Sequence, residues 1–268
     1  MSVLSFDTET TGLDRRTADM FSYSVCTLDG VSNVYRIKGD PLRSIINIQE
    51  LRKLWSDTSI TKIMHNAKFD LGFTMKVLGL SIDDLEKNHI EDTSLMSKVL
   101  QNDHPSHALK QLTKELFGFP VDDETRVRPY LKGESNYSYC PEEVFEVYQH
   151  RDAQRTVLLY LHFLERIKAN KDTFEIYRSE VDLILPTLQM EERGVMIRRS
   201  ACVSLIQELE GKTKLSLAKY AHRAAQDAEQ LSVRESPLVH KVAQVAGIVH
   251  KWGEDKQSAT FTLNVLNI

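Results

Sequence analysis

The chain has 268 residues, 41% of them hydrophobic, with 34 Lys plus Arg against 38 Asp plus Glu and a formal net charge of −4. These values are ordinary for a soluble globular protein and exclude a broadly basic protein that coats nucleic acid by charge alone. No apolar run is long enough to span a membrane, and the three cysteines (Cys26, Cys140 and Cys202) are odd in number and widely separated. We therefore expect a cytoplasmic protein without a disulfide framework.

The first half of the chain alternates strand-like and helix-like segments. Asp29-Gly30 is a strong hairpin signal between the second and third strand. In chain order the predicted elements are strands at 3–7, 22–28 and 32–37, a helix at 41–55, a strand at 60–64, a helix containing 69–77, a short strand near residue 90, and helices from about residues 93 and 107. Strands paired by a hairpin and then alternating with helices favour an α/β layer fold with a mixed sheet.

The second half of the chain is mainly helical. Residues 117–139 contain two prolines and two glycines without periodicity, which is typical of a long surface loop, and Pro141 opens a long amphipathic helix. The best boundary is at residues 169–172, which predicts one domain at 1–171 and a helical extension at 172–268. In that extension we expect helices at 174–192, 200–230 and 237–252 and a final strand at 260–265.

Two carboxylates stand out in the first strand. Asp7 and Glu9 are separated by one residue, so they project to the same side of a strand. They repel each other unless a cation lies between them, and oxygen-only ligands suit Mg²⁺ or Mn²⁺. An isolated Asp-x-Glu pair is also compatible with two acids that simply face water.

Two further pairs extend this pattern. Asn66 and Asp70 are four residues apart where a strand passes into a helix, and Tyr148 and Asp152 are four apart on the long helix. Residues at this spacing share one face of a helix. The sequence thus supplies four carboxylates and a tyrosine that we expect at one end of the sheet.

Three motifs, Phe-Asp-x-Glu-Thr-x-Gly-Leu from Phe6, Asn-x-x-x-Phe-Asp from Asn66 and Tyr-x-x-x-Asp from Tyr148, occur in this order. In this respect the chain resembles the DEDDy 3′–5′ exonucleases. Residues 91–100 and 107–118 are similar to stretches of the proofreading domain of family A (DNA polymerase I-type) DNA polymerases. Residues 185–197 are similar to the helix that follows that domain, where the polymerase thumb begins.

The resemblance implies an RNase H-like mixed five-stranded sheet flanked by helices, followed by an all-helical extension similar to the start of a polymerase thumb. It also implies two divalent metal ions, Mg²⁺ or Mn²⁺. Asp7, Glu9 and Asp152 would hold the first ion, and Asp7, with Asp70 through water, the second. Tyr148 would orient the attacking water.

The same resemblance assigns residues to the DNA 3′ end. Leu13 matches a residue that wedges against the terminal base, and Phe69 matches one that stacks on a base, although both could equally be ordinary core residues. The full predicted DNA-binding set is Thr10, Leu13, Asn66, Lys68 and Phe69.

One departure from the family is large. The chain carries no Asp-Tyr-Ser-x-Ile-Glu-type stretch and no His-Asp-Glu, so we expect no polymerase activity. It is either a fragment or a split exonuclease subunit, as in some bacteriophages, with a separate DNA polymerase subunit as its partner in the host cytoplasm.

The expected activity is removal of nucleotides from DNA 3′ ends, preferably single-stranded, with release of 5′-nucleoside monophosphates. The alternatives are a ribonuclease D-like exoribonuclease and a non-catalytic scaffold for a polymerase.

Overall fold

A computed structural model describes residues 2–120, 122–132 and 136–231. Contacts divide the chain into two compact units, Met1–Gly194 and Val195–Ile268. The strands of the first unit are β1 (Ser2–Thr10), β2 (Met20–Thr27), β3 (Ser32–Arg36), β4 (Ile60–Met64) and β5 (His89–Asp92). Its helices are α1 (Pro41–Ser56), α2 (Ala67–Leu78), α3 (Ile82–Glu86), α4 (Thr93–Leu100), α5 (Leu109–Phe117), α6 (Asp122–Val127), the 3₁₀ helix η1 (Arg128–Tyr130), α7 (Glu142–Lys168), α8 (Lys171–Asp182) and α9 (Ile184–Arg193).

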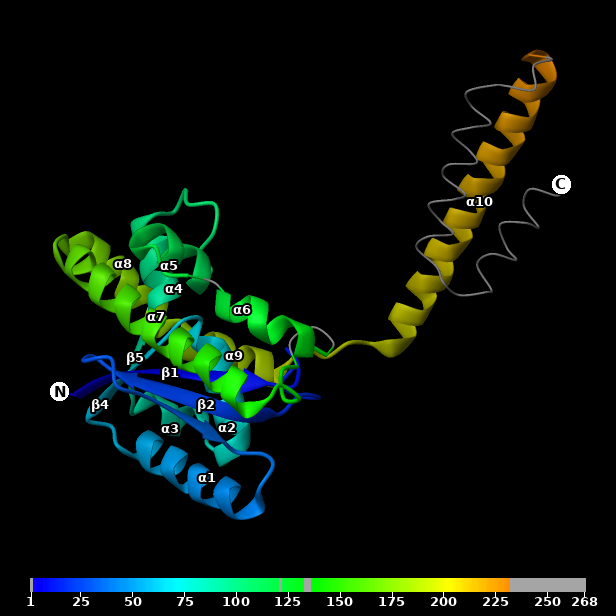
Figure 1. Ribbon diagram of the computed structural model, residues 1–268. Helices are drawn as coiled ribbons and strands as arrows, with labels where there is room; N and C mark the ends of the chain where they lie inside the picture. Colours follow the sequence, from blue (N-terminus) through cyan, green and yellow to red (C-terminus); the bar gives the residue numbers. More distant parts are fainter. Residues whose placement is uncertain (1, 121, 133–135, 232–268) are drawn as a thin grey trace. The chain divides into compact units, whose positions relative to one another are not determined.

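The five strands form one mixed sheet in the order β3-β2-β1-β4-β5, which confirms the predicted fold class (Figure 1). β1 and β2 are antiparallel, as are β2 and β3, whereas β1, β4 and β5 run parallel. β1 extends three residues past the predicted end at Asp7, because Asp7 and Glu9 pair with Ser24 and Ser22 of β2. The two acids therefore lie inside the central strand.

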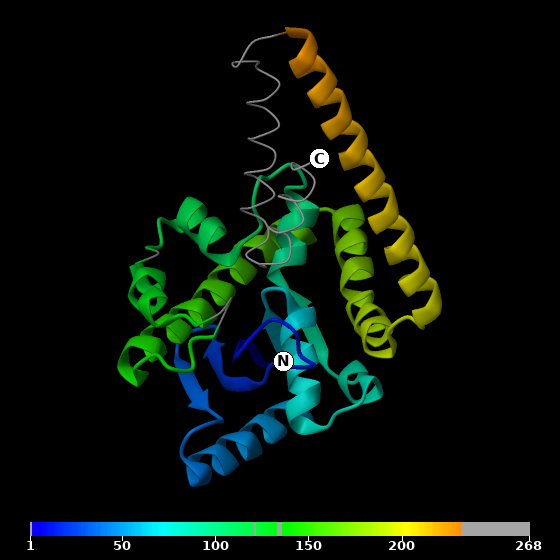
Figure 2. The ribbon, with the colours of Figure 1, turned by 90° about the vertical axis from the view of Figure 1, so that its right-hand side faces the viewer.

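Helices cover both faces of the sheet, so the first unit has three layers (Figures 1 and 2). α1, α2 and α3 lie on one face, and α4, α5, α7 and α8 on the other. The core on the α1 side contains Phe6, whose ring meets the ring of Trp55 edge-on at 5.4 Å. Burial of such aromatic side chains is a main source of stability in a domain of this size.

The segment 117–139, predicted as a long surface loop, is partly ordered as helix. It contains α6 and η1, and Val127 at the end of α6 is fully buried in a cluster with Phe145 and Tyr148 of α7. Val127 has no regularly spaced apolar neighbours in the sequence, so hydrophobic periodicity did not predict this helix. The consequence is that this segment forms one wall around Tyr148.

The helix predicted at 174–192 is divided into α8 and α9 at Leu183, just before Pro186, a residue that a continuous helix interior does not accommodate. Both helices pack on the first unit, where Tyr177, Val181 and Leu188 are buried in the same core as Phe6. The contacts therefore place α8 and α9 with the first unit, whereas the division of domains between residues 171 and 172 remains a prediction.

Replacement of Tyr177 by Phe tests this attachment of α8. The Tyr177 hydroxyl donates a hydrogen bond to Glu91 and accepts one from the Asp92 amide at 3.0 Å. Because Tyr177→Phe leaves both groups without this partner, we expect the free energy of unfolding to fall by about 1–3 kcal/mol. Urea unfolding measures the change, with the exposed Tyr139→Phe as a control expected to stay within about 0.5 kcal/mol of the parent. Equal stability of the two variants would contradict the attachment.

The described part of the second unit contains helix α10 (Arg199–Leu231), in agreement with the predicted helix at 200–230 and with a helical C-terminal part. The helix predicted at 237–252 and the strand at 260–265 lie outside the described residues. Within the residues that the structure describes, no helix combines the length and apolar character needed to cross a membrane.

Candidate active site

The alternation of β1 sorts its side chains between the two helical layers. Ser5 faces α7, because its hydroxyl donates to the Ala153 carbonyl at 2.8 Å, and Asp7 and Glu9 have the same parity along the strand. Phe6 faces the opposite layer and packs against Trp55. The predicted carboxylate pair is therefore directed to the side of the sheet on which α7 lies.

Asp70 approaches β1 from the start of α2. The β1–β4 ladder ends at the pair Ser5–Ile63, and beyond that point the Asp70 carboxylate meets β1 directly. It accepts hydrogen bonds from the Thr8 amide at 2.9 Å and the Thr8 hydroxyl at 2.6 Å. Asp70 is buried, so these two bonds fix its carboxylate beside the central strand.

The backbone turn before α2 is stabilised by a second acid. Asn66 adopts a left-handed conformation with φ of 76°, which Asn tolerates better than most residues. Asp92 accepts hydrogen bonds from the amides of Asn66 at 3.2 Å and Ala67 at 2.8 Å, and it also caps α4 through the Ser94 amide at 2.8 Å. Asp92 thus sets where α2 starts and thereby where Asp70 lies.

Tyr148 and Asp152 lie one turn apart on α7, and both are buried. Asp152 Oδ1 accepts a hydrogen bond from Arg155 Nη1 at 2.6 Å, and Asp152 Oδ2 lies 3.4 Å from Lys110 Nζ. The same Lys110 ammonium lies 4.1 Å from the centre of the Tyr148 ring. Asp152 is therefore held between two cations.

The four carboxylates are close enough to perturb one another. Burial, followed by repulsion from Asp70, Glu9 and Asp152, raises the pKa of Asp7 well above its usual value. Burial and then repulsion from Asp152 raise the pKa of Glu9 to about 8, and burial raises the pKa of Asp70 to about 7 despite its bonds to Thr8. The structure thus brings together the predicted catalytic set, Asp7, Glu9, Asp70, Tyr148 and Asp152.

The cluster has two chemical features of a cation site, an unpaired carboxylate oxygen and a set of oxygen-only donors. Asp7 Oδ2 is buried and has no hydrogen-bond partner, a costly arrangement for a carboxylate oxygen. Among the described residues, no group of three or more His, Cys, Asp or Glu side chains is arranged so that it could hold a metal ion. The reason is visible in the contacts, because Asp70 is turned to Thr8 and Asp152 to Arg155 and Lys110. The oxygen-only donors fit a hard divalent ion once these side chains reorient.

The raised pKa values predict a pH dependence for protein kept in EDTA. A carboxyl group whose pKa is higher in the folded than in the unfolded state binds more protons when folded, so stability falls as pH rises between the two values. We expect the free energy of unfolding to decrease from about pH 5 to about pH 8, the upper limit set by Glu9. Urea titrations at several pH values measure the slope, which should be smaller in Glu9→Gln. An identical slope in both proteins would contradict the pKa assignment.

The predicted DNA-binding residues surround the start of α2 and the end of β1. Leu13 is 58% exposed, Asn66 is exposed, and Phe69 is half-buried with its ring 5.0 Å from that of Phe73. The Thr10 hydroxyl donates to the Gly12 carbonyl at 2.7 Å. Leu13 and Asn66 are therefore exposed to solvent, whereas the Thr10 hydroxyl is hydrogen-bonded within its own turn.

Lys68, the predicted phosphate contact, is ion-paired in the structure. Its ammonium donates to Glu191 of α9, and Arg15 bonds to Glu191 and to Glu192. A phosphate would have to compete with Glu191 for Lys68. This pairing joins α2 to α9 and could not be foreseen from the separate motifs.

Sequence reasoning missed two cations of the site. Arg155 is three residues after Asp152 on one helix, a spacing at which side chains meet, so this pair could have been found. Lys110 comes from α5, far from Asp152 in the chain, and only the fold brings it there.

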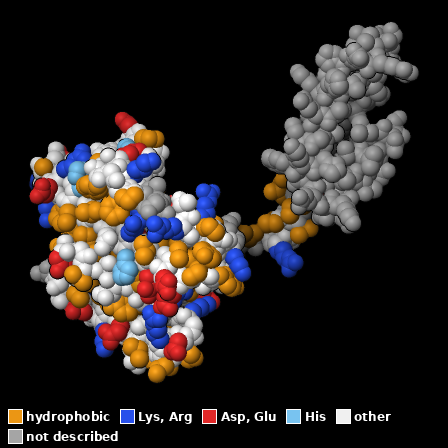
Figure 3. Space-filling model, viewed as in Figure 1, with side chains coloured by type: hydrophobic (Ala, Val, Ile, Leu, Met, Phe, Trp, Pro, Cys, Tyr) orange, Lys and Arg blue, Asp and Glu red, His pale blue; other side chains and the backbone are white. Residues whose placement is uncertain are grey.

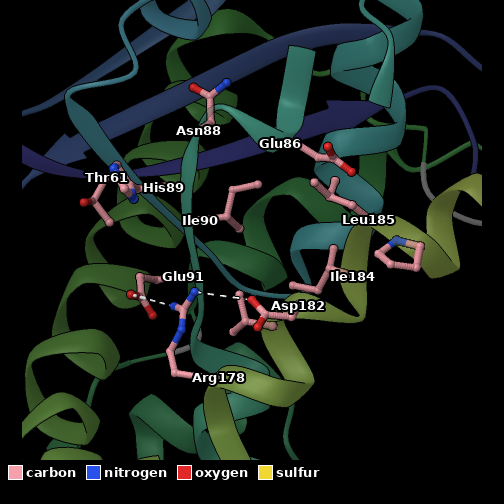
Figure 4. A pocket seen from close by; sticks show the side chains of 12 residues that line it. Thr61, Glu86, Asn88, His89, Ile90, Glu91, Arg178, Asp182, Ile184 and Leu185 are labelled. Carbon is pink, nitrogen blue, oxygen red and sulfur yellow. Dashed lines mark hydrogen bonds and ion pairs between the residues drawn. The ribbon is translucent and has the colours of Figure 1, made fainter. Parts of the chain in front are cut away.

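A cavity of about 470 Å³ lies away from these residues (Figure 4). It is bounded by β5, α8 and α9, and its Arg178 side chain pairs with Glu91 and Asp182. None of the predicted catalytic or DNA-binding residues lines it. The cavity is therefore separate from the candidate active site.

Comparison with known proteins places the chain in a family. A model of the 3′–5′ exonuclease family matches residues 1–168. The DNA polymerase of Escherichia phage T5 is 27% identical over 208 residues, which cover 72% of this chain and 24% of that polymerase. DNA polymerase DpoZ of Vibrio phage phiVC8 is 24% identical over 268 residues, covering 92% of this chain and 41% of DpoZ. The chain thus spans about a quarter of the T5 relative and less than half of DpoZ.

Solved structures share the fold. Brucella melitensis NrnC with bound Mg²⁺ has a TM-score of 0.55 at 20% identity, covering 72% of this chain and 86% of NrnC. Escherichia coli RNase D, described as an exoribonuclease, has a TM-score of 0.53 at 16% identity, covering 70% of this chain and 45% of RNase D. At these identities the likeness confirms the RNase H-like exonuclease fold alone. The family match spans every strand of the sheet and all of α7, and the chain belongs to the 3′–5′ exonuclease family of family A DNA polymerases.

Proposed function

We propose that the chain is a two-metal-ion 3′–5′ exonuclease of the proofreading type, which removes nucleotides from DNA 3′ ends and releases 5′-nucleoside monophosphates. The observation that carries this proposal is the cluster of Asp7, Glu9, Asp70 and Asp152, in which the carboxylates repel one another and one Asp7 oxygen is buried without a hydrogen-bond partner, so that bound cations would stabilise it. Membership of the exonuclease family supports it.

The carboxylates would hold divalent ions, Mg²⁺ or Mn²⁺, with Asp7, Glu9 and Asp152 at one position and Asp7 and Asp70 at the other. When bound, such ions supply Lewis-acid stabilisation of the charge that develops at the phosphodiester. Thr8 and Asp92 fix Asp70 and the start of α2, so the ligands come from two rigid elements and from α7. Positions supported in this way favour precise chemistry.

Tyr148 would orient the attacking water through its hydroxyl. Burial, followed by the negative charges of Glu9, Asp152 and Asp7, raises the pKa of Tyr148 well above its usual value. The phenol therefore stays protonated at neutral pH and acts as a hydrogen-bond donor and acceptor rather than as a base.

The DNA 3′ end would lie across the end of β1 and the start of α2. Leu13 is exposed where a terminal base could rest, Phe69 offers a partly exposed ring, and Lys68 could exchange Glu191 for a phosphate. In the view of Figure 3 the Lys and Arg side chains lie among Asp and Glu side chains rather than in one broad basic area. Such a surface suits contact with a few phosphates of a single strand better than with a long duplex.

A ribonuclease function is the second candidate, because solved relatives in fold include RNase D and NrnC bound to pGG. The curated relatives that match in sequence are DNA polymerases, which favours DNA. If the chain is a split subunit, its partner would be a separate DNA polymerase chain.

Matched DNA and RNA oligonucleotides of one sequence test the substrate. We expect single-stranded DNA to be degraded at least about tenfold faster than RNA, with 5′-nucleoside monophosphates as products by chromatography, because a proofreading site is built for a deoxyribose terminus. Faster degradation of RNA would move the assignment to an exoribonuclease.

A further inference from the structure

Lys110 is placed among the acids of the candidate active site. From the first turn of α5 its ammonium reaches Asp152 Oδ2 at 3.4 Å and lies over the Tyr148 ring at 4.1 Å. Its charge also acts on Asp7 and Glu9, since it lowers the pKa of both and opposes the repulsion from the other carboxylates. A built-in cation thus occupies the neighbourhood in which a divalent ion would bind.

The two cations that hold Asp152 differ in their freedom. The Arg155 side chain is 0% exposed, donates to the Pro120 carbonyl and lies over the Phe119 ring at 4.9 Å. The Lys110 side chain is 19% exposed, and its distance to Asp152 is longer. Arg155 is therefore a fixed support of Asp152 Oδ1, whereas Lys110 can leave Oδ2.

A second acceptor for Lys110 is already nearby. Glu124 of α6 has its Oε2 atom 3.9 Å from Lys110 Nζ, and its side chain is 48% exposed. A small rotation of the Lys110 side chain toward Glu124 would free Asp152 Oδ2 while keeping the ammonium paired. Lysine suits such a change because its charge lies on a flexible four-carbon stem.

We propose that Lys110 is an exchangeable internal cation, which neutralises Asp152 Oδ2 in the protein without divalent ions and which a divalent ion must displace toward Glu124. This inference rests on the proposed metal-dependent function. Lys110 is a positioning residue that acts through Asp152. It stabilises the cluster before metal binds, and it raises the metal concentration at which the site fills.

The test is Mn²⁺ binding to the full chain by calorimetry, after removal of metals with EDTA and dialysis. The coupling between two binding events typically changes an affinity about 5- to 150-fold. The Lys110 ammonium and the divalent ion would bind the same carboxylate, so we expect Lys110→Met to bind Mn²⁺ at least about fivefold more tightly than the parent. Lys110→Arg keeps a cation and should bind Mn²⁺ no more tightly than the parent. Lys114→Met, an exposed lysine one turn further along α5, is the matched control and should leave Mn²⁺ affinity unchanged.

A second readout separates this role from simple packing of the lysine stem. In EDTA, Lys110→Met should have a lower unfolding temperature than the parent, because the acids lose their counter-charge, and saturating Mn²⁺ should remove the difference. Equal or weaker Mn²⁺ affinity of Lys110→Met, or the same loss of unfolding temperature with and without Mn²⁺, would overturn the inference and leave the proposed function standing. Absence of Mn²⁺ binding by the parent would overturn both.

Discussion

We expect Asp70→Asn to lose about 10²- to 10³-fold of the exonuclease rate while the fold is kept or slightly stabilised. Asparagine retains an oxygen that can accept from the Thr8 amide at 2.9 Å and hydroxyl at 2.6 Å, so the local geometry survives. It removes one negative charge from a buried cluster in which the pKa of Asp70 is raised to about 7. The rate with single-stranded DNA and the unfolding temperature in EDTA measure the two effects.

The comparison with Asp70→Ala sharpens this prediction. Alanine removes the same charge but leaves the Thr8 amide and hydroxyl without their acceptor, at a cost of about 1–3 kcal/mol that offsets the relief of repulsion. Asp70→Ala should therefore be as inactive as Asp70→Asn and less stable. Asp83→Asn, an exposed acid of α3, is the matched control and should change neither quantity. Parental activity of Asp70→Asn would contradict the assignment of Asp70.

The second large effect is expected for Tyr148→Phe. The ring is held by Phe145 at 6.2 Å and Tyr137 at 5.6 Å, contacts that phenylalanine keeps. Only the hydroxyl is lost, and with it the proposed orientation of water, so we expect the rate to fall about 10²-fold at unchanged DNA affinity. Single-turnover rates at saturating DNA, together with DNA binding measured in Ca²⁺, separate the two quantities.

Tyr139→Phe serves as the control for this variant, because it removes the same hydroxyl group from an exposed tyrosine that precedes α7. It should retain the parental rate. If Tyr148→Phe instead cleaved at the parental rate, or lost rate only through weaker DNA binding, Tyr148 would be a packing residue of the cluster around Val127 and Phe145.

The fold was predictable where short-range patterns determine it. The hairpin at Asp29-Gly30 and the strand at 60–64 follow from turn chemistry and from apolar runs. The assignment of α8 and α9 to the first unit was not predictable, because a helical stripe shows that a helix packs but not on which core. The helix break at Leu183 could have been predicted from Pro186, but the continuous apolar periodicity of 174–192 favoured a single helix.

The site divides in the same way. The order of three motifs identified Asp7, Glu9, Asp70, Tyr148 and Asp152, and the structure gathers them. The ion pairs of Lys110 with Asp152 and of Lys68 with Glu191 were not predictable, because only the tertiary packing of α5 and α9 brings these residues together. An ion pair between two separate helices produces no characteristic residue spacing in the sequence, so it cannot be predicted from the sequence alone.

The central claim is tested most directly by a time course on 5′-labelled single-stranded DNA in Mg²⁺ or Mn²⁺, resolved on a sequencing gel. We expect a ladder that shortens by one nucleotide at a time from the 3′ end, and no ladder in EDTA or with Asp70→Asn. An intact band in both metals, from protein shown to be folded, would contradict the account and favour a non-catalytic partner of a polymerase.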